Sequence, residues 1–159
     1  MDNFSPLVTT RTATPDEYKR VIELAKEMYD AIELGLETTG WEESAIDWLG
    51  DASKRGITEV AVAYDSATER VVASGIGIIY EDVPQPWLPN GKMGYIRWMS
   101  TTEEFRGYGV GEQVLNHLMN WFNDNDVVRV NLHAPDKAID FYRQHGFEDT
   151  NFDNMWWRK

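Results

Sequence analysis

Apolar residues in the first third of the chain recur at the spacing of helices. A β-prone segment at residues 7–13 precedes Thr-Pro-Asp-Glu at residues 14–17, which combines a capping-box spacing with proline at the first helical position. We therefore expect a helix to start here and to end at Gly35 or Gly40. Its buried face should comprise Tyr18, Val21, Ile22, Ala25, Met28, Tyr29 and Ile32, which follow the three-and-four spacing of one helical face.

The pattern then changes from helical to β spacing. A second, shorter helix is predicted over residues 42–55, with Gly56 as its stop. Its expected inward positions are Ala45, Trp48, Leu49 and Ala52. Residues 58–64 alternate in the manner of a strand, with Val60, Val62 and Tyr64 on one side. The turn-forming residues 65–68 separate them from a β-prone run at 70–80. This order predicts a β-hairpin.

Glycine and proline mark two features in the middle of the chain. Gly75 and Gly77 weaken the second hairpin strand and indicate a bulge or the close approach of another backbone. Residues 81–91 hold three of the six prolines and are expected to form a structured loop.

The last third of the chain alternates strands and helices. A strand is predicted over residues 92–101, a short buried strand over 127–133 and a last strand region over 147–158. A helix over residues 135–144, capped by a glycine, lies between the last two. A longer helix over residues 109–125 has an apolar face made of Val110, Val114, Leu115, Leu118, Met119 and Phe122.

The order of these elements predicts an α/β fold of the α+β type. Antiparallel neighbours come first and crossover helices later, which indicates one central mixed β-sheet with helices on both faces. The length of 159 residues and the hydrophobic content of 42% suit a single domain over residues 1–159.

Charge and hydropathy exclude several kinds of partner. The net charge of −12 disfavours nucleic acid and anionic membrane surfaces, because both require a basic surface. No apolar run approaches the roughly 18 residues of a membrane span. The amino terminus lacks the basic and apolar regions of a signal peptide, so we expect a cytoplasmic protein.

Cysteine and histidine limit the chemistry. The chain has no cysteine, which excludes thiolate nucleophiles and thiolate metal sites. The three histidines, His117, His133 and His145, are not spaced to place two of them on one helical face, so no metal site is expected.

The stretch from Arg97 to Glu112 contains the strongest candidate for a ligand site. It predicts a strand, a short turn, and then Arg106 with glycines at positions 107, 109 and 111 leading into a helix. The first N–H groups of a helix lack intrahelical partners and lie at the positive end of the helix dipole. Glycines allow an anion to approach these donors closely, so we expect a polyanion such as a pyrophosphate to bind here.

Two common phosphate-binding motifs do not fit this stretch. A P-loop requires Gly, four residues and then Gly-Lys-Ser or Gly-Lys-Thr, and the chain has no such run. The dinucleotide motif Gly-x-Gly-x-x-Gly fails because Glu112 occupies the position of its third glycine.

Two motifs instead resemble those of the GCN5-related N-acetyltransferase (GNAT) superfamily. The family's Arg-x-x-Gly-x-Gly turn, which holds the pyrophosphate of acetyl-coenzyme A (acetyl-CoA), is similar to Arg106-Gly107-Tyr108-Gly109-Val110-Gly111. Its Ala-x-x-x-Tyr-x-x-x-Gly-Phe motif is similar to Ala138-Ile-Asp-Phe-Tyr142-Arg-Gln-His-Gly146-Phe147. Leu-His-Ala at residues 132–134 resembles a subset of small prokaryotic members. The resemblance covers residues 93–147 and leaves the acceptor-binding part least covered.

This resemblance implies the GNAT acyltransferase fold and an acetyl-CoA-dependent N-acetyltransferase. The exposed backbone of the strand at Met99, Ser100 and Thr101 would pair with the pantetheine arm of the cosubstrate. The remaining implied contacts are Arg106, Gly107, Tyr108, Gly109, Val110, Gly111, Glu112, Ala138, Phe141 and Tyr142. One position departs from the family pattern, because Pro135 stands where many members have a cofactor-contacting Asn or Ser.

The resemblance also implies direct attack of an amine on the thioester. Tyr142 would stand near the sulfur as general acid. Glu81, Asp82 and His133 are the candidates for the base. A solvated loop start is the alternative for Glu81 and Asp82, and a structural hydrogen bond is the alternative for His133.

The acceptor is expected to be a small primary amine that is cationic before reaction. From Asp16 to Asp51, eleven acidic residues oppose three basic ones, a net charge of −8 that would attract a cation. A solvated acidic helix face is the alternative. Polyamine, aminoglycoside-like amine, amino-acid amine and peptide N-terminus all stay open. Of the seven tryptophans, Trp41 and Trp87 are the candidates for facing the acceptor.

Two further expectations concern assembly and activity. A homodimer is the family-level expectation, and the apolar residues 155–157 would either contribute to it or close the core. The rival function is a CoA-binding regulatory or interaction domain without turnover.

Overall fold

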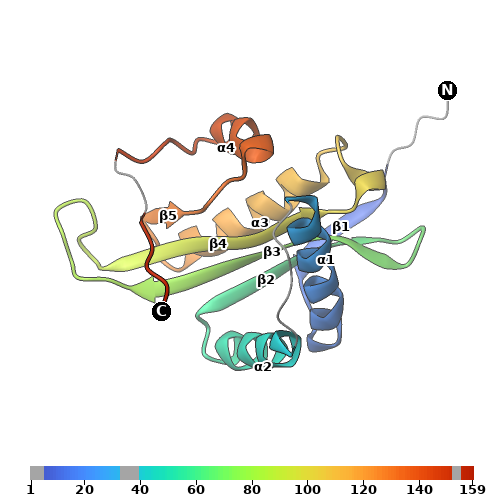
Figure 1. The fold of residues 1–159 in the computed structure, drawn as a ribbon, viewed down its shortest axis with the longest axis horizontal. Helices are drawn as coiled ribbons and strands as arrows, with labels where there is room; N and C mark the ends of the chain where they lie inside the picture. The colour runs from blue at the N-terminus through green and yellow to red at the C-terminus, as the bar shows by residue number, and fades with distance from the viewer. Residues whose placement is uncertain (1–5, 33–39, 152–154) are drawn as a thin grey trace.

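A computed structural model of the chain describes residues 6–32, 40–151 and 155–159, and it contains one five-stranded mixed sheet (Figure 1). The strand order is β1-β2-β3-β4-β5, antiparallel from β1 to β4 and parallel between β4 and β5. The strands are β1 (Val8–Thr12), β2 (Thr58–Asp65), β3 (Arg70–Glu81), β4 (Lys92–Thr101) and β5 (Arg129–Asn131). The predicted mixed sheet is confirmed.

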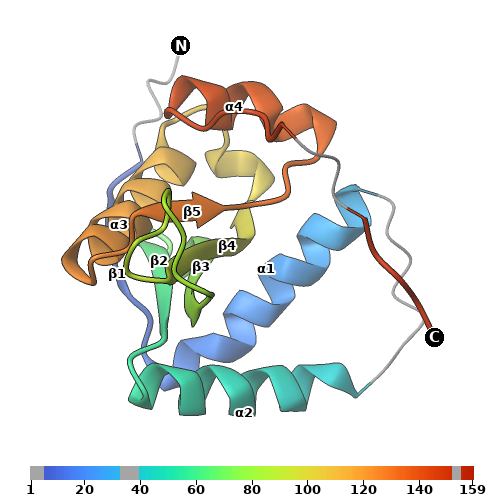
Figure 2. The ribbon, with the colours of Figure 1, turned by 90° about the vertical axis from the view of Figure 1, so that its left-hand side faces the viewer.

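Helices cover both faces of this sheet, as predicted. α1 and α2 lie on one face and α3 on the other, while α4 lies beside β5 (Figures 1 and 2). The helices are α1 (Tyr18–Ala31), α2 (Trp41–Lys54), α3 (Val110–Asp124) and α4 (Ile139–Gln144). Short 3-10 turns are η1 (Pro15–Glu17), η2 (Glu103–Phe105) and η3 (Asp136–Ala138).

The predicted start of the first helix is confirmed. The Thr14 N–H donates to the Glu17 carboxylate at 2.8 Å, and Arg11 donates two hydrogen bonds to the same carboxylate. The Arg11 guanidinium therefore holds the pKa of Glu17 below its usual value. The predicted end differs, because α1 stops at Ala31 and Gly40 is the left-handed residue that begins α2. The alternative stop at residue 35 lies outside the described residues.

α2 confirms one part of its predicted inward face and corrects another. Leu49 and Ala52 are buried against the sheet. Trp48, however, is 45% exposed, so its predicted burial is wrong. The reason is that Trp48 and Ala45 border a pocket that no described side chain fills.

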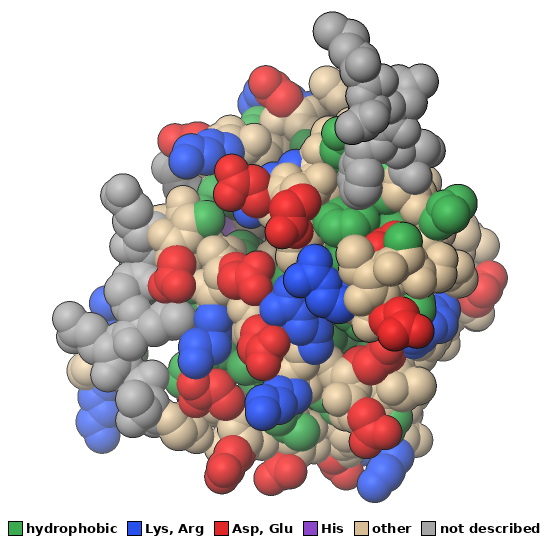
Figure 3. All heavy atoms as spheres, turned by 90° about the vertical axis from the view of Figure 1, so that its right-hand side faces the viewer, with side chains coloured by type: hydrophobic (Ala, Val, Ile, Leu, Met, Phe, Trp, Pro, Cys, Tyr) green, Lys and Arg blue, Asp and Glu red, His purple; other side chains and the backbone are tan. Residues whose placement is uncertain are grey.

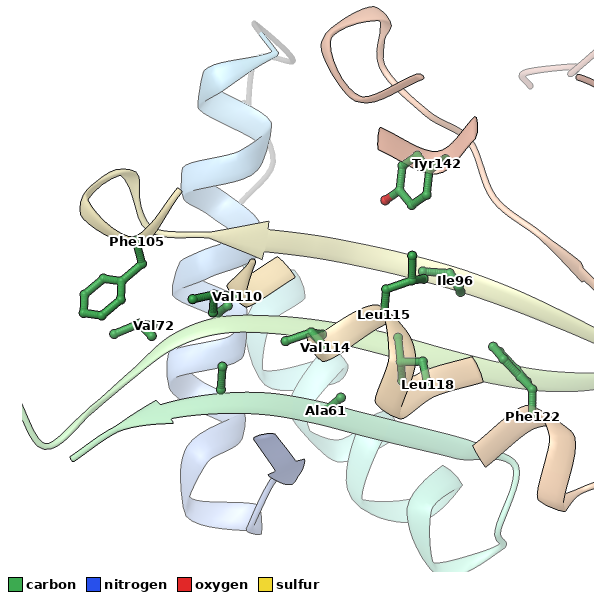
Figure 4. Packing of buried hydrophobic residues seen from close by; sticks show 12 residues of the cluster. Ala61, Val72, Ile96, Phe105, Val110, Val114, Leu115, Leu118, Phe122 and Tyr142 are labelled. Atoms are coloured by element: carbon green, nitrogen blue, oxygen red, sulfur yellow. The ribbon is translucent and has the colours of Figure 1, made fainter. Parts of the chain in front are cut away.

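Two hydrophobic clusters occupy the two faces of the sheet. β2 is buried on both sides, with Val60 and Val62 in the cluster under α1 and α2, and Ala61 and Ala63 in the cluster under α3. Figure 4 shows the second cluster, in which the α3 side chains Leu118 and Phe122 lie against the sheet. The small alanines let α3 approach the strands closely.

Glycines in β3 and β4 also let neighbouring side chains approach the sheet closely. A Cβ at Gly94 would lie 2.8 Å from Phe122 and 2.9 Å from Val130. A Cβ at Gly75 would lie 2.4 Å from the Met99 sulfur. The bulge or close approach predicted at Gly75 is confirmed, although the approaching atoms are side chains of α3 and β4 rather than another backbone.

The bulge in β4 lies opposite Gly75. Ser74 pairs with Ser100 and Ile76 with Arg97, so two residues of β4 face one residue of β3. The first of these two, Trp98, has a left-handed backbone with φ of 52°. Non-glycine residues adopt this conformation at a cost, and bulges frequently re-aim side chains next to active sites.

The carboxyl-terminal part corrects two predictions. β5 contains only three residues, none of them buried, so it is not the predicted buried strand. Residues 147–151 and 155–159 form no strand, so the predicted last strand is absent from the described part of this region. The side chains of Met155, Trp156 and Trp157 are between 72% and 88% exposed, so they do not close the core, and a role in a homodimer stays a prediction.

Replacing Gly94 by alanine tests the packing of α3 on the sheet. The added methyl group overlaps Phe122 and Val130, so we expect the free energy of unfolding to fall by about 1–3 kcal/mol. Gly50→Ala is the control, because nothing lies within 4 Å of its Cβ position inside α2. That change should raise the free energy by about 0.5–1 kcal/mol. Urea denaturation measures both, and a stable Gly94→Ala variant would contradict the packing described.

Candidate active site

The glycine turn adopts the conformation that its residues allow. Gly107 and Gly109 have φ of 80° and 75°, in the left-handed region that favours glycine. Gly109 caps α3 and its carbonyl accepts the first helical bond, from Gln113. The N–H groups at positions 110–112 therefore have no partner within the helix. The Arg106 side chain is anchored beside them by a 2.9 Å bond from Nε to the Thr101 carbonyl.

The edge of β4 is open next to this turn. Parallel pairing with β5 ends at Tyr95 and Asn131. Beyond Tyr95, no strand of the described residues pairs with that edge of β4 as far as Thr101. The half-buried residues Met99, Ser100 and Thr101 lie in this unpaired part. An extended ligand with amide groups can pair with such an edge in the manner of an added strand.

α4 brings the second predicted motif to the same place. The position of a Cβ on Gly111 lies 3.4 Å from the Thr101 hydroxyl and 4.0 Å from the Phe141 ring. Ala138 and Phe141 are half-buried and pack against the cluster under α3. The strand, the glycine turn and α4 therefore converge around Gly111.

Tyr142 is the buried aromatic residue of α4. Its ring is 8% exposed and packs against Phe141 and Phe147, with centroids 5.1 and 5.7 Å away. Figure 4 shows the ring above β4, near Ile96. Within the described ranges, its hydroxyl has no hydrogen-bond partner. Burial raises the pKa of Tyr142 to about 12, so the phenol stays protonated at neutral pH.

The structure does not bring Glu81 to this place. Glu81 pairs with Lys92 at the opposite end of β4 from Thr101. The nine residue steps between Lys92 and Thr101 correspond to about 30 Å of strand. Asp82, the next residue, is exposed and accepts a 2.7 Å bond from the Val83 N–H.

His133 lies beside the open edge, after β5. Its Nδ1 atom and the Tyr95 hydroxyl form a hydrogen bond. The Arg97 guanidinium lies 4.7 Å from the centroid of the Tyr95 ring. Burial raises the pKa of Tyr95, and the charge of Arg97 opposes this shift. No group of three or more metal-ligating side chains occurs among the described residues.

A pocket of about 320 Å³ opens on the face of the sheet under α2. The described residues of its lining are apolar except for one guanidinium, and they are Ala45, Trp48, Leu49, Ile76, Ile78, Arg97 and Trp98. Trp98 lies within the open edge, which begins after Tyr95, and directly precedes Met99. The Trp98 indole is fixed in place because Nε1 donates to the Tyr29 hydroxyl at 2.6 Å and the ring packs edge-on against Trp41 at 5.8 Å.

Sequence patterns alone did not assign a site role to four residues of this face: Trp48, Tyr95, Arg97 and Trp98. Of the two tryptophans it singled out, Trp41 packs on Trp98, whereas Trp87 lies in the loop after β3 and does not line the pocket. The sequence signal by which Arg97 and Trp98 could have been found is a charged residue beside a tryptophan, inside a strand that leads into the glycine turn. The direction of these side chains depends on the bulge, which the sequence does not specify.

The acidic segment from Asp16 to Asp51 is partly neutralised by ion pairs. Arg20 lies 3.3 Å from Glu23 and 2.9 Å from Glu27. Lys26 lies 3.1 Å from Glu42. On the face shown in Figure 3, acidic and basic side chains accordingly lie next to one another. No helix in the described ranges is long and apolar enough to cross a membrane.

Comparison with known proteins defines the class. The chain matches the acetyltransferase (GNAT) domain family over residues 56–149, more than half of its length. The protein therefore belongs to the GNAT superfamily. Both motifs, at residues 106–111 and 138–147, lie within the matched region. Membership in this family supports an acetyl-transfer activity.

Solved structures share the whole fold. A predicted acetyltransferase from Clostridium acetobutylicum, crystallised with acetyl-CoA, has a TM-score of 0.86 at 17% identity, covering 94% of this chain and 96% of that one. An aminoglycoside acetyltransferase from an uncultured soil metagenomic sample, in complex with sisomicin, has a TM-score of 0.72 at 15% identity, covering 96% and 97%. At these identities the likeness shows the fold alone.

One curated relative shares a short stretch of sequence. A probable serine/threonine-protein kinase of Dictyostelium discoideum is 32% identical over 54 residues. The match spans 34% of this chain and 7% of the length of that protein. It covers too little of either chain to show a shared activity.

The buried phenol should make stability depend on pH in the alkaline range. The pKa of Tyr142 is about 12 in the folded protein and about 10 in an unfolded chain. Its stabilising contribution is therefore complete below pH 10 and is lost as the pH rises towards 12. We expect urea denaturation to show Tyr142→Phe gaining about 2 kcal/mol relative to the unsubstituted protein between pH 9 and pH 12.

The control for this prediction is Gly50→Ala, which removes no ionisable group. It should shift the free energy of unfolding by the same amount at every pH. Parallel pH profiles for Tyr142→Phe and the unsubstituted protein would contradict the burial of this phenol.

Proposed function

We propose that the protein is an acetyl-CoA-dependent N-acetyltransferase that transfers an acetyl group to a small primary amine. The observation that carries this proposal is the convergence of three parts around Gly111: the open edge of β4, the left-handed glycine turn and the buried Tyr142 of α4. Family membership supports the acetyl transfer, and the convergence supports the site.

Acetyl-CoA fits the groups that these parts present. The backbone of Met99, Ser100 and Thr101 would pair with the amides of the pantetheine arm. Arg106 and the N–H groups from Gly107 to Glu112 would hold the pyrophosphate, with a fixed charge and the positive end of the α3 dipole. Pro135 directly precedes η3 and has no N–H to donate, so it supplies no hydrogen bond to the cosubstrate.

Tyr142 would stabilise the departing thiolate. A phenol with a pKa of about 12 holds its proton more tightly than a thiol, whose ordinary pKa is about 8.5. Complete transfer of the proton from the phenol to the sulfur is therefore unfavourable. Donation of a strong hydrogen bond to the negatively charged sulfur is favourable. The hydroxyl is available for this bond because it has no partner among the described residues.

His133 would accept the proton of the amine through Tyr95. The Tyr95 hydroxyl and His133 Nδ1 are hydrogen-bonded, so a proton released near Tyr95 has a path to the imidazole. Glu81 pairs with Lys92, at the end of β4 opposite to Thr101 and the glycine turn, and has no assigned role in this proposal. The amine arrives as an ammonium ion, and the net negative segment under the sheet would raise its local concentration.

Thiol release from acetyl-CoA separates this proposal from its rival, a CoA-binding domain without turnover. The proposed enzyme releases CoA thiol when a suitable amine is added. Tight binding of acetyl-CoA without thiol release from any of a broad panel of amines would favour the rival.

The role of Tyr142 predicts a specific kinetic change. Tyr142→Phe should lower kcat by about 100-fold, because the leaving thiolate loses its hydrogen-bond donor. The dissociation constant of acetyl-CoA should stay within about twofold, since the interaction forms only during the reaction. Steady-state thiol release and calorimetric titration measure the two quantities. Unchanged kcat would remove Tyr142 from the mechanism.

The role of Arg106 predicts weaker cosubstrate binding. Arg106→Ala should raise the dissociation constant of acetyl-CoA by about 10- to 100-fold, because a charge-assisted contact with the pyrophosphate is lost. Arg55→Ala removes the same charge at the end of α2, where the side chain is 62% exposed, and should leave binding unchanged. Equal affinities for the two variants would mean that the glycine turn does not hold the pyrophosphate.

A further inference from the structure

We infer that the acceptor carries both an aromatic ring and a carboxylate, as an aromatic amino acid does. The ring would occupy the pocket under α2, and the carboxylate would bind Arg97. This inference rests on the proposed function, since it names the class of amine that the same site receives.

The pocket has the size and surface for one ring. Its volume of about 320 Å³ is at the small end of the range for ligand pockets, about 300–1,000 Å³. Two indoles, Trp48 and Trp98, and two isoleucines border it. The Trp48 side chain is 45% exposed although it belongs to the apolar face of α2. A flat apolar group in the pocket would cover this exposed indole and stack on it.

Arg97 supplies the only charge among the described residues that line this pocket. Its side chain is exposed, touches the Tyr95 ring, and forms no ion pair with any described residue. A guanidinium binds a carboxylate through two parallel hydrogen bonds. Among the described residues, no Asp or Glu lines the pocket, so these residues offer no counter-ion to a second ammonium group. This charge pattern favours an anionic group on the acceptor and disfavours polyamines and aminoglycosides.

The same arrangement places the amine for reaction. Trp98 lines the pocket and directly precedes Met99 on the open edge of β4, which begins after Tyr95. Tyr95, under the Arg97 guanidinium, leads to His133. An α-amino group lies one carbon from its carboxylate, so an acceptor held at Arg97 presents its amine beside Tyr95 and the open edge. The nearby guanidinium also favours loss of the ammonium proton, because like charges lower the pKa of a cationic acid.

Matched acceptors test the carboxylate and the ring separately. The probes are L-phenylalanine, phenethylamine (the same amine without the carboxylate), L-alanine (the same amino acid without the ring) and spermidine. We expect kcat/KM for L-phenylalanine to exceed that of each other probe by about tenfold or more, since a bidentate pair and a buried ring each contribute that much.

Two substitutions should remove these preferences one at a time. Arg97→Gln should bring kcat/KM for L-phenylalanine down to the value that phenethylamine shows with the same variant, so that the preference for the carboxylate is lost. Trp48→Ala should lower kcat/KM for both aromatic probes by about tenfold and leave L-alanine within about twofold. Arg55→Gln is the charge control on α2 and should change neither preference. Circular dichroism confirms that each variant is folded.

A binding measurement distinguishes failure of the inference from failure of the proposed function. Calorimetric titration with L-phenylalanine is performed on protein saturated with CoA, and the Arg97→Gln and Trp48→Ala variants should weaken the binding. If L-phenylalanine binds but no amine gives thiol release, the acceptor class stands and the catalytic proposal fails. If spermidine reacts best, or if Arg97→Gln leaves the preference for L-phenylalanine intact, the inference is wrong and the enzyme proposal stands.

Discussion

The candidate site depends on β4 losing its neighbour halfway along its length. β5 is so short that pairing ends at Tyr95, which leaves backbone donors and acceptors of a central strand exposed at one edge. Unpaired backbone groups inside a sheet are costly, so such an edge is retained where a ligand replaces the missing strand. The glycine turn and α4 flank this same edge, and Gly111 lies between Thr101 and Phe141.

The bulge in β4 connects that edge to the opposite face of the sheet. Regular alternation keeps each strand residue on one face. The extra residue at the bulge, opposite Gly75, gives Trp98 a left-handed backbone and directs its ring towards α1 and α2, while Met99 packs under α3. One irregularity thus lets a single strand present both the open edge for the cosubstrate and a wall of the proposed acceptor pocket.

The glycine turn and the pocket under α2 present different charges, in a way that suits group transfer. The glycine turn offers a guanidinium and helix N–H groups to a polyanion. The described lining of the pocket offers a single guanidinium and no carboxylate, although the segment that contains α1 and α2 is strongly acidic. The ion pairs of Arg20 and Lys26 hold part of that acidity on the outer surface of the helices. A count of charges along the chain therefore does not describe the charge at the site.

Local patterns in the sequence determined most of the fold and half of the site. The capping residues before α1, the apolar spacing of α3 and the hairpin turn act over a few positions, so the elements they specify were predicted correctly. The glycine turn and the α4 motif were identifiable for the same reason. Only the tertiary structure decided the three-residue length of β5, the exposure of Trp48, the pairing of Glu81 with the Lys92 end of β4, and the meeting of Trp48, Arg97 and Trp98 around one pocket. Each of these depends on strand register, on the bulge opposite Gly75 or on packing between segments far apart in the chain, and such contacts have no local signature.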